Sequence, residues 1–310
     1  MKRTILLCLI HIAGTMASFS QSSPWKANGV AIPARLDLDV HWLSPGVFPR
    51  EVWEYDLLPN KFSPEVISNL VSLCLFTAKD KVEKGGEGIV FQTIDHSRIL
   101  SISFASGNIQ YEMPERLYSA TNLAVGVPST DQLAKTATTI LDKLHIGLND
   151  ITGWRSTNKF DFSEPLTLYY LGDTTITNIP YRTVYFRRSV DGMPIAGHFY
   201  RFNVGERGEI AKISMAWPNM KRAKSYPTVS PNEVVHFLRS GNAIRGPVPT
   251  NIGDLDWLSI KSVTIKKAIP SYLITHNQLY PFLRLDVLVN TGSETIEIGL
   301  DCPIIDETKL

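Results

Sequence analysis

The sequence lacks the short motifs that identify the common classes of enzyme. It contains no G-x-S-x-G nucleophile elbow, no H-E-x-x-H zinc motif, no Walker loop and no G-x-G-x-x-G dinucleotide motif. The glycine-rich run Gly85-Gly86-Glu87-Gly88 follows no strand pattern of the kind that a phosphate loop requires, so we interpret it as a flexible connection. These absences disfavour catalysis, and no cofactor is expected.

An excess of charge of either sign is also missing. The 310 residues include 31 Lys and Arg against 30 Asp and Glu, which gives a formal net charge of +1. A protein that binds nucleic acid with its whole surface needs a clear basic excess, so nucleic acid is not expected as a partner. With 44% hydrophobic and 20% charged residues, a chain of this length can bury a core without disulfide or metal staples.

Cysteine is scarce, with three residues in the chain. Cys8 lies in the N-terminal apolar run, which leaves Cys74 and Cys302, too few for a thiolate zinc site. In an oxidising compartment this pair could form a disulfide. Cys74 also falls in an apolar helical pattern where a small buried thiol packs well, so the free and the bonded state both stay open.

Long hydrophobic runs are missing beyond the N-terminus. Lys2 and Arg3 precede an apolar run from Ile5 to about Ala17, followed by small polar residues, which is the pattern of a secretory signal peptide over residues 1–20. The run is shorter than the roughly 20 residues that cross a bilayer, so no stable membrane anchor is expected after signal removal. We therefore expect an extracytoplasmic protein, secreted or located in the cell envelope.

Three similar helix starts divide the rest of the chain. They lie at Ser63-Pro64-Glu65, at Ser129 with Gln132, and at Ser230-Pro231-Asn232-Glu233. Strand-like runs with hairpin turns such as Asp191-Gly192 follow each helix. The predicted fold class is α+β, built from tandem lobes in which a helix packs on an antiparallel β-meander. The expected divisions are a signal peptide at 1–20, an extended segment at 21–60, and helix-plus-sheet units at 61–125, 126–225 and 226–310.

The stretch from Tyr181 to Gly241 carries a recognisable pattern. Its features are Asp191-Gly192 with Pro194, a strand closing at Gly205, a restart at Gly208-Glu209-Ile210, Trp217, and the helix opening at Ser230-Pro231. This pattern resembles the PepSY-like lobes of secreted and cell-envelope regulatory proteins, including the YycI/YycH type and the propeptides of thermolysin-like proteases. Such lobes bind or restrain a partner without doing chemistry. The resemblance therefore implies an exported, non-catalytic binding or regulatory protein whose partner is a protein or an envelope component.

Charge is unevenly distributed along the chain. The segment from Pro180 to Pro270 holds 14 Lys and Arg against six Asp and Glu, whereas loss of Lys2 and Arg3 with the signal takes the whole chain from +1 to −1. This basic segment indicates an anionic partner surface, complementarity within the molecule, or a solvated face. The candidate partner-binding residues are Arg182, Arg188, Arg201, Lys212, Lys221, Arg222 and Lys224.

One weak metal candidate precedes the first helix. In an extended chain, Asp37, Asp39 and His41 would share one face and could hold a divalent cation. The same alternation is typical of the wet face of any half-buried strand.

Two further groups of polar residues leave catalysis open. Asp254 and Asp256 could act as a glycosidase-like carboxylate pair or simply lie in a turn, and His198 could act as a base or be structural. The alternative function is therefore a secreted hydrolase of unrecognised type that uses Asp37, Asp39 and His41, or Asp254 and Asp256. A purely structural envelope protein is the third hypothesis.

Overall fold

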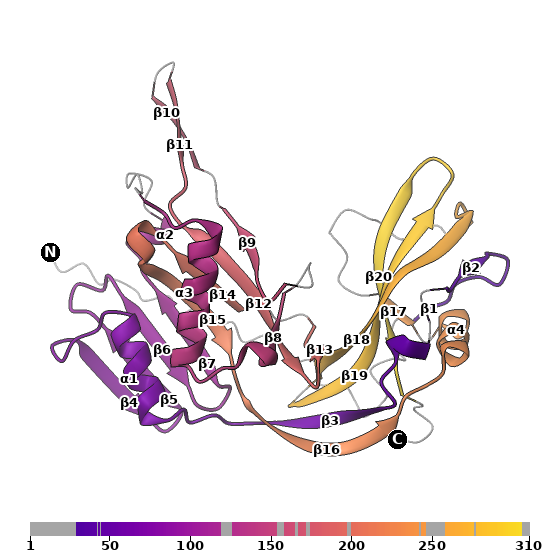
Figure 1. Ribbon diagram of the computed structural model, residues 1–310, viewed down its shortest axis with the longest axis horizontal. Coiled ribbons are helices and arrows are strands. Elements are labelled where there is room, and N and C mark those ends of the chain that lie inside the picture. The colour runs from indigo at the N-terminus through magenta and orange to yellow at the C-terminus, as the bar shows by residue number, and fades with distance from the viewer. Residues whose placement is uncertain are drawn as a thin grey trace, which may run out of the picture.

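Two large β-sheets and a ribbon that joins them make up the described part of the chain (Figure 1). The computed structural model describes residues 29–41, 43, 45–118, 126–153, 158–164, 167–171, 174–196, 200–241, 243–245, 258–275 and 277–305.

The first sheet has ten strands and forms the left half of Figure 1. From one edge to the other its main path runs through β13 (Met193–Pro194), β12 (Arg182–Val190), β14 (Tyr200–Val204), β15 (Ile210–Ala216), β7 (Asn108–Glu112), β6 (Ile99–Ser103), β5 (Gly88–Gln92) and β4 (Lys81–Gly85). The short strands β8 (Ile151–Thr152) and β9 (Asp161–Ser163) also pair with β12. Every pairing in this sheet is antiparallel.

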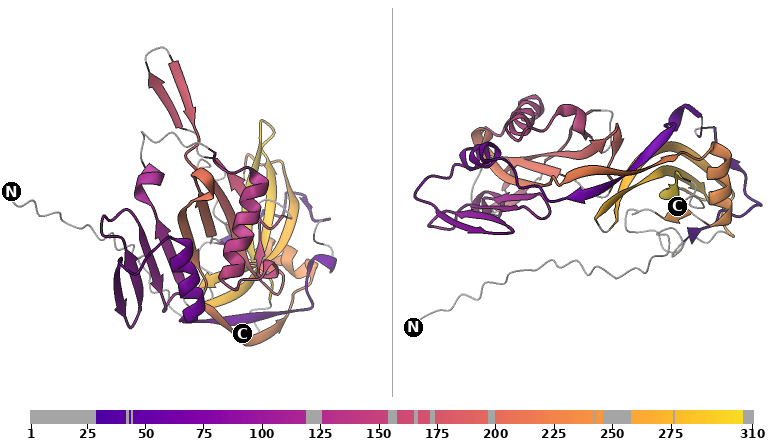
Figure 2. Two further views of the ribbon diagram at one scale, coloured as in Figure 1. Left: turned by 60° about the vertical axis from the view of Figure 1, so that its left-hand side comes forward. Right: turned by 90° about the horizontal axis from the view of Figure 1, so that it is seen from below.

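Helices α1 (Pro64–Leu73) and α3 (Thr130–Lys143) cover one face of this sheet (Figure 2). The predicted caps are confirmed: the Ser63 side chain accepts a hydrogen bond from the Val66 amide, and Ser129 and Gln132 form a capping box. Buried side chains of both helices pack in one hydrophobic core with alternate residues of the strands. A shorter helix, α2 (Pro114–Tyr118), follows β7.

The second sheet has eight strands, and its long central strands form the right half of Figure 1. The main path runs through β1 (Gly29–Val30), β17 (Ala243–Arg245), β20 (Thr295–Pro303), β19 (Gln278–Asn290), β18 (Ser262–Thr275) and β2 (Leu38–Asp39). Helix α4 (Pro231–Ser240) begins at the predicted Ser230 capping box and buries Val234 and Leu238 in a core separate from the first.

Strands β3 (Glu51–Leu58) and β16 (Asn219–Pro227) pair to form the ribbon between the two halves. The β19 strand adds to the ribbon on the β3 side, through Gln278 and Leu279, so the ribbon belongs to the eight-stranded sheet. A separate hairpin of β10 (Thr167–Leu171) and β11 (Thr174–Asn178) projects from the upper end of the half that contains the ten-stranded sheet (Figure 1).

The predicted fold class, α+β with tandem helix-on-meander lobes, is wrong. The structure is mostly β, with two large multi-stranded sheets. The strands that follow the first two helices combine into one sheet, because the terminal strands β7 and β15 pair along their length, from Lys212 opposite Glu112 to Ala216 opposite Asn108. An unpaired strand edge leaves backbone hydrogen-bonding groups exposed, and this pairing removes two such edges at once.

The two candidate disulfide partners are free cysteines that lie in different cores. Cys74 packs in the core beneath α1 and Cys302 in the core of the eight-stranded sheet, and both are fully buried. Burial raises the pKa of both thiols, because a thiolate loses its hydration inside the protein.

The helices of the described residues offer no candidate for a membrane span, since none combines sufficient length with sufficient apolar character.

Substitution of Leu70 tests the shared core of α1 and α3. Leu70 is fully buried, so Leu70→Ala should lower the free energy of unfolding by about 2–5 kcal/mol. Hydrogen–deuterium exchange should show faster exchange of the amides of α3 together with those of α1. The matched control is Ile94→Ala, since Ile94 is 78% exposed and its truncation should cost less than about 0.5 kcal/mol. Faster exchange confined to α1 would contradict a shared core.

Candidate functional site

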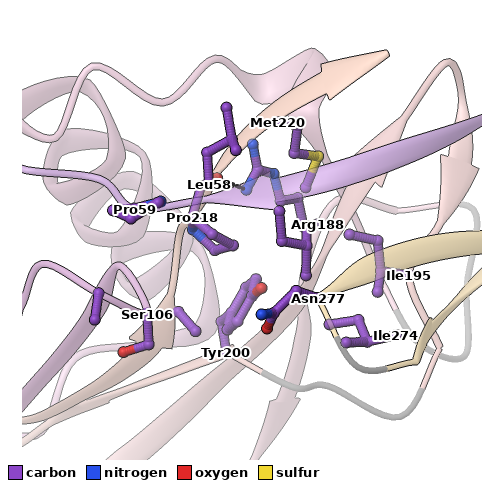
Figure 3. Close-up of a pocket in the computed structure, with 13 residues that line it drawn as sticks. Leu58, Pro59, Ser106, Arg188, Ile195, Tyr200, Pro218, Met220, Ile274 and Asn277 are labelled. Carbon is purple, nitrogen blue, oxygen red and sulfur yellow. Dashed lines mark hydrogen bonds between the residues drawn. The ribbon is translucent and has the colours of Figure 1, made fainter. Parts of the chain in front are cut away.

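A cavity of about 510 Å³ lies where the two sheets meet the ribbon of β3 and β16 (Figure 3). Its walls come from β3, β12, β14, β15, β16 and the turns next to them, from the β6–β7 turn, and from the end of the β18–β19 hairpin. The lining residues are Leu57, Leu58, Pro59, Ala105, Ser106, Arg188, Ile195, Tyr200, Ala216, Pro218, Met220, Ile274 and Asn277. The wall is therefore mostly apolar, and we call this space the junction cavity.

Arg188 supplies the cation of the junction cavity. It stands near the end of β12, and its Nη1 donates a 2.6 Å hydrogen bond to the Pro218 carbonyl oxygen. The guanidinium carbon lies 4.2 Å from the centre of the Trp217 ring, so a cation–π contact covers one face of the group. None of the ion pairs among the described residues includes Arg188. Burial lowers the pKa of Arg188 to about 10, so the group remains charged at neutral pH.

Three neutral polar residues, Ser106, Tyr200 and Asn277, also line the junction cavity. Tyr200 begins β14 and is 3% exposed, with its ring 5.8 Å from that of Trp217 and 5.6 Å from that of Phe186. Burial raises the pKa of its hydroxyl to about 12, so Tyr200 keeps its proton and can donate a hydrogen bond. Asn277, in the β18–β19 turn, fixes its backbone by accepting a 2.7 Å hydrogen bond from the Leu57 amide, and its side chain faces the cavity (Figure 3).

A polar cluster beside the cavity ties the ten-stranded sheet to the ribbon. The Tyr55 hydroxyl of β3 donates to Asp191, which lies in the β12–β13 turn, and Arg222 Nη2 of β16 donates to the same carboxylate at 3.1 Å. Burial, and then the bond to Asp191, raise the pKa of Tyr55, which keeps this hydroxyl a donor. Asp191 takes a positive φ of 49° beside Gly192, as the predicted hairpin turn requires.

The seven basic candidates from the sequence do not form one patch. Arg182 and Arg188 lie at opposite ends of β12 on the face that carries Val184 and Phe186, whereas the registers place Arg201 and Lys212 on the opposite face. The other three, Lys221, Arg222 and Lys224, lie exposed on β16 of the ribbon.

Two of the candidates on the ten-stranded sheet have partners within the molecule. Arg182 Nε donates to Glu164 at 2.5 Å and its Nη1 to the Pro128 carbonyl oxygen, while Lys212 donates to Glu112 across the β7–β15 pair. The positive charges of these two residues are therefore balanced by acidic or carbonyl partners within the fold. Arg188 instead faces the junction cavity.

The candidate metal residues do not converge. Strand β2 covers only Leu38 and Asp39, the chain turns at His41, and the exposed His41 ring bonds to Asp39 at 2.7 Å. Among the described residues no group of three or more His, Cys, Asp or Glu side chains could hold a metal ion. Asp254, Asp256 and His198 lie outside the described residues, as does the predicted signal peptide at 1–20.

Sequence reasoning missed most of the junction cavity. It selected Arg188 for its charge, but Asn277, Met220 and Leu57 carry no motif and come from distant parts of the chain. Tyr200 followed an alternating strand pattern that predicts only a core position.

Comparison with models of known protein families finds no match, and comparison with curated proteins finds no significant similarity.

Removal of the Tyr55 hydroxyl tests the link between the ten-stranded sheet and the ribbon. Tyr55→Phe should lower the free energy of unfolding by about 1–3 kcal/mol, because a hydrogen bond to a charged acceptor is lost while the ring keeps its edge contact with Tyr272 at 5.6 Å. Chemical denaturation measures this change. Tyr185→Phe is the control, since its hydroxyl only accepts an exposed 3.3 Å bond from Ser163. Equal losses of unfolding free energy in the two variants would show that the Tyr55–Asp191 hydrogen bond does not contribute to stability.

Proposed function

We propose that this chain is an exported, non-catalytic binding protein that holds its ligand in the junction cavity. The observation that carries the proposal is the cavity itself, mostly apolar, placed between two sheets, and containing one arginine without an acidic partner among the described residues. A volume of about 510 Å³ falls in the range of small-molecule sites, which are often found between structural units and combine apolar walls with a few polar groups.

The chemistry of the lining favours binding over catalysis. The 13 residues that line the cavity include no Asp, Glu, His or Cys. General acid–base and nucleophilic catalysis most often need such a group within hydrogen-bond distance of the reacting atoms. The hydrolase alternative would have to use Asp37, Asp39 and His41, none of which lines the cavity, or Asp254 and Asp256.

Export and a regulatory role are part of the same proposal. The N-terminal pattern of Lys2, Arg3 and the following apolar run supports export. The resemblance of residues 181–241 to PepSY-like lobes supports a role in binding an envelope component or a partner protein.

Probe binding to the junction cavity, and its loss when a larger side chain fills the cavity, test the proposed function. The neutral probe N-phenyl-1-naphthylamine and the anionic probe 1-anilinonaphthalene-8-sulfonate should each be tried, and at least one should bind the full chain at a single saturable site. Ala216→Phe should abolish this binding, because the new ring occupies the cavity. Fluorescence titration measures the binding, and circular dichroism confirms that the variant folds.

Ala105→Trp, at an exposed position of the cavity wall, serves as a second blocking variant, and Ala78→Trp, at an exposed position away from the cavity, as the matched control. The proposal fails if neither probe saturates a site, or if both blocking variants bind as well as the control does.

A protein partner is a second candidate, favoured by the free edge of β16. Among the described strands β16 pairs only with β3, and its exposed Lys221, Arg222 and Lys224 give that edge a positive charge. Arg222 is held 5.0 Å above the Trp53 ring and Lys224 4.7 Å above the Tyr226 ring, which orders both cations. An acidic extended segment of a partner could add to this edge as a further strand.

Charge reversal tests this second surface. Lys221→Glu combined with Lys224→Glu leaves the Arg222–Asp191 contact in place and should release a partner that the wild-type chain retains. Quantitative mass spectrometry of complexes crosslinked in secreting cells measures retention. The control combines Lys266→Glu with Lys267→Glu on β18, where both lysines are exposed. Retention of the same partners by all three proteins would exclude the β16 edge.

A further inference from the structure

The polar groups of the junction cavity select the chemistry of its ligand, provided that the cavity is a binding site as proposed. Arg188 is the only charged residue among the 13 that line it. A ligand that fills this space must therefore satisfy one positive charge and an otherwise largely apolar wall.

The hydrogen bonds of Arg188 leave one side of its guanidinium available. The group carries five N–H donors, and the bond to the Pro218 carbonyl oxygen uses Nη1. Nε and Nη2 make no hydrogen bond to the described residues, and together they present the parallel pair of donors that matches a carboxylate. With Trp217 stacked on one face, the plane of the guanidinium is already fixed.

The nearest acids in the described part of the chain form no ion pair with Arg188. Asp191, three residues further along the chain, binds Tyr55 and Arg222. Asp150 acts on Arg188 only through space and forms no ion pair with it among the described residues. A cation that is largely removed from water without an anion is costly, and an anion brought in by a ligand would compensate that cost.

The remaining wall fits an apolar body. Leu57 and Met220 are register partners across the β3–β16 pair. Ile195 and Ile274 continue the wall below Met220, at the right of the close-up (Figure 3). Methionine adapts its shape to irregular apolar groups, so Met220 can follow the contour of a chain or ring.

We infer that the junction cavity binds an amphipathic monocarboxylate, with its carboxylate on Nε and Nη2 of Arg188 and its apolar body along Leu57, Met220, Ile195 and Ile274. A dianionic phosphate would need a second cation, and the lining contains no Lys and no other Arg. The Tyr200 hydroxyl and the Asn277 amide can bond to a polar substituent on the body, but the carboxylate does not depend on them.

Three ligands with the same ten-carbon chain and different heads test the inference: decanoate, 1-decanol and decyltrimethylammonium. Displacement of a bound fluorescent probe or calorimetry, below micelle-forming concentrations, gives their affinities for the full chain. Decanoate should bind at least about tenfold more tightly than 1-decanol, the effect expected for a charged bidentate pair. Decyltrimethylammonium should bind more weakly than both.

The Arg188→Gln variant locates the preference. It removes the charge but keeps a donor for the Pro218 carbonyl oxygen, so decanoate should lose about tenfold in affinity while 1-decanol changes by less than about threefold. Arg201→Gln, on the opposite face of the sheet, is the matched control and should leave all three affinities unchanged.

Two results separate the ligand class from the proposed function. If decanoate and 1-decanol bind equally well to the wild-type chain, the monocarboxylate inference is wrong although the cavity still binds ligands. If no probe or amphiphile saturates the cavity, the proposed function itself is wrong. The wild-type comparison decides the ligand class even where Arg188→Gln fails to fold.

Discussion

The antiparallel pairing of β3 with β16 is the constraint on which the rest of the structure depends. The chain enters the ten-stranded sheet through β3, which leads to α1, and leaves it through β16, which leads to α4. Because these two crossings pair with each other, the two sheets are held at one separation. The Tyr55–Asp191–Arg222 cluster then fixes the β12–β13 hairpin against this ribbon, and the bridge between Ile195 and Tyr272 ties the chain after β13 to β18. The junction cavity is the space that these contacts leave between the sheets.

The environment of Arg188 in that cavity differs from the environments of basic residues elsewhere in the two sheets. Lys212 and Arg182 hold acidic partners within the ten-stranded sheet, and Arg284 forms a double hydrogen bond with the buried Asp301 in the other sheet. Arg188 has an aromatic face and one carbonyl oxygen in place of a carboxylate. A partly buried cation without a carboxylate lowers the stability of the free protein, and a bound anion would compensate that cost.

Local features of the fold could be predicted, whereas the joining of its parts could not. Ser63, Ser129 and Ser230 each cap a helix as expected, and Asp191-Gly192 forms its hairpin turn, because caps and turns depend on residues a few positions apart. The prediction of separate lobes was wrong because the sequence does not show which strand edges will pair. Strand β16 was not predicted, because its run of basic residues lacks the alternation of apolar and polar residues that is typical of a half-buried strand.

The sequence by itself determined the helix starts, the hairpin turns, the scarcity of cysteine and the absence of recognisable catalytic motifs, and it marked Arg188 only as one of many positive charges. The tertiary structure alone decided that β7 pairs with β15 and that Cys74 and Cys302 lie in different cores. It also decided that Arg188 stacks on Trp217 and lines one cavity with Met220 and Asn277. The reason is the range of the interactions. Helix caps and hairpin turns depend on residues a few positions apart. Sheet pairing and the burial of charges instead involve residues such as Glu112 and Lys212, which lie 100 positions apart in the chain.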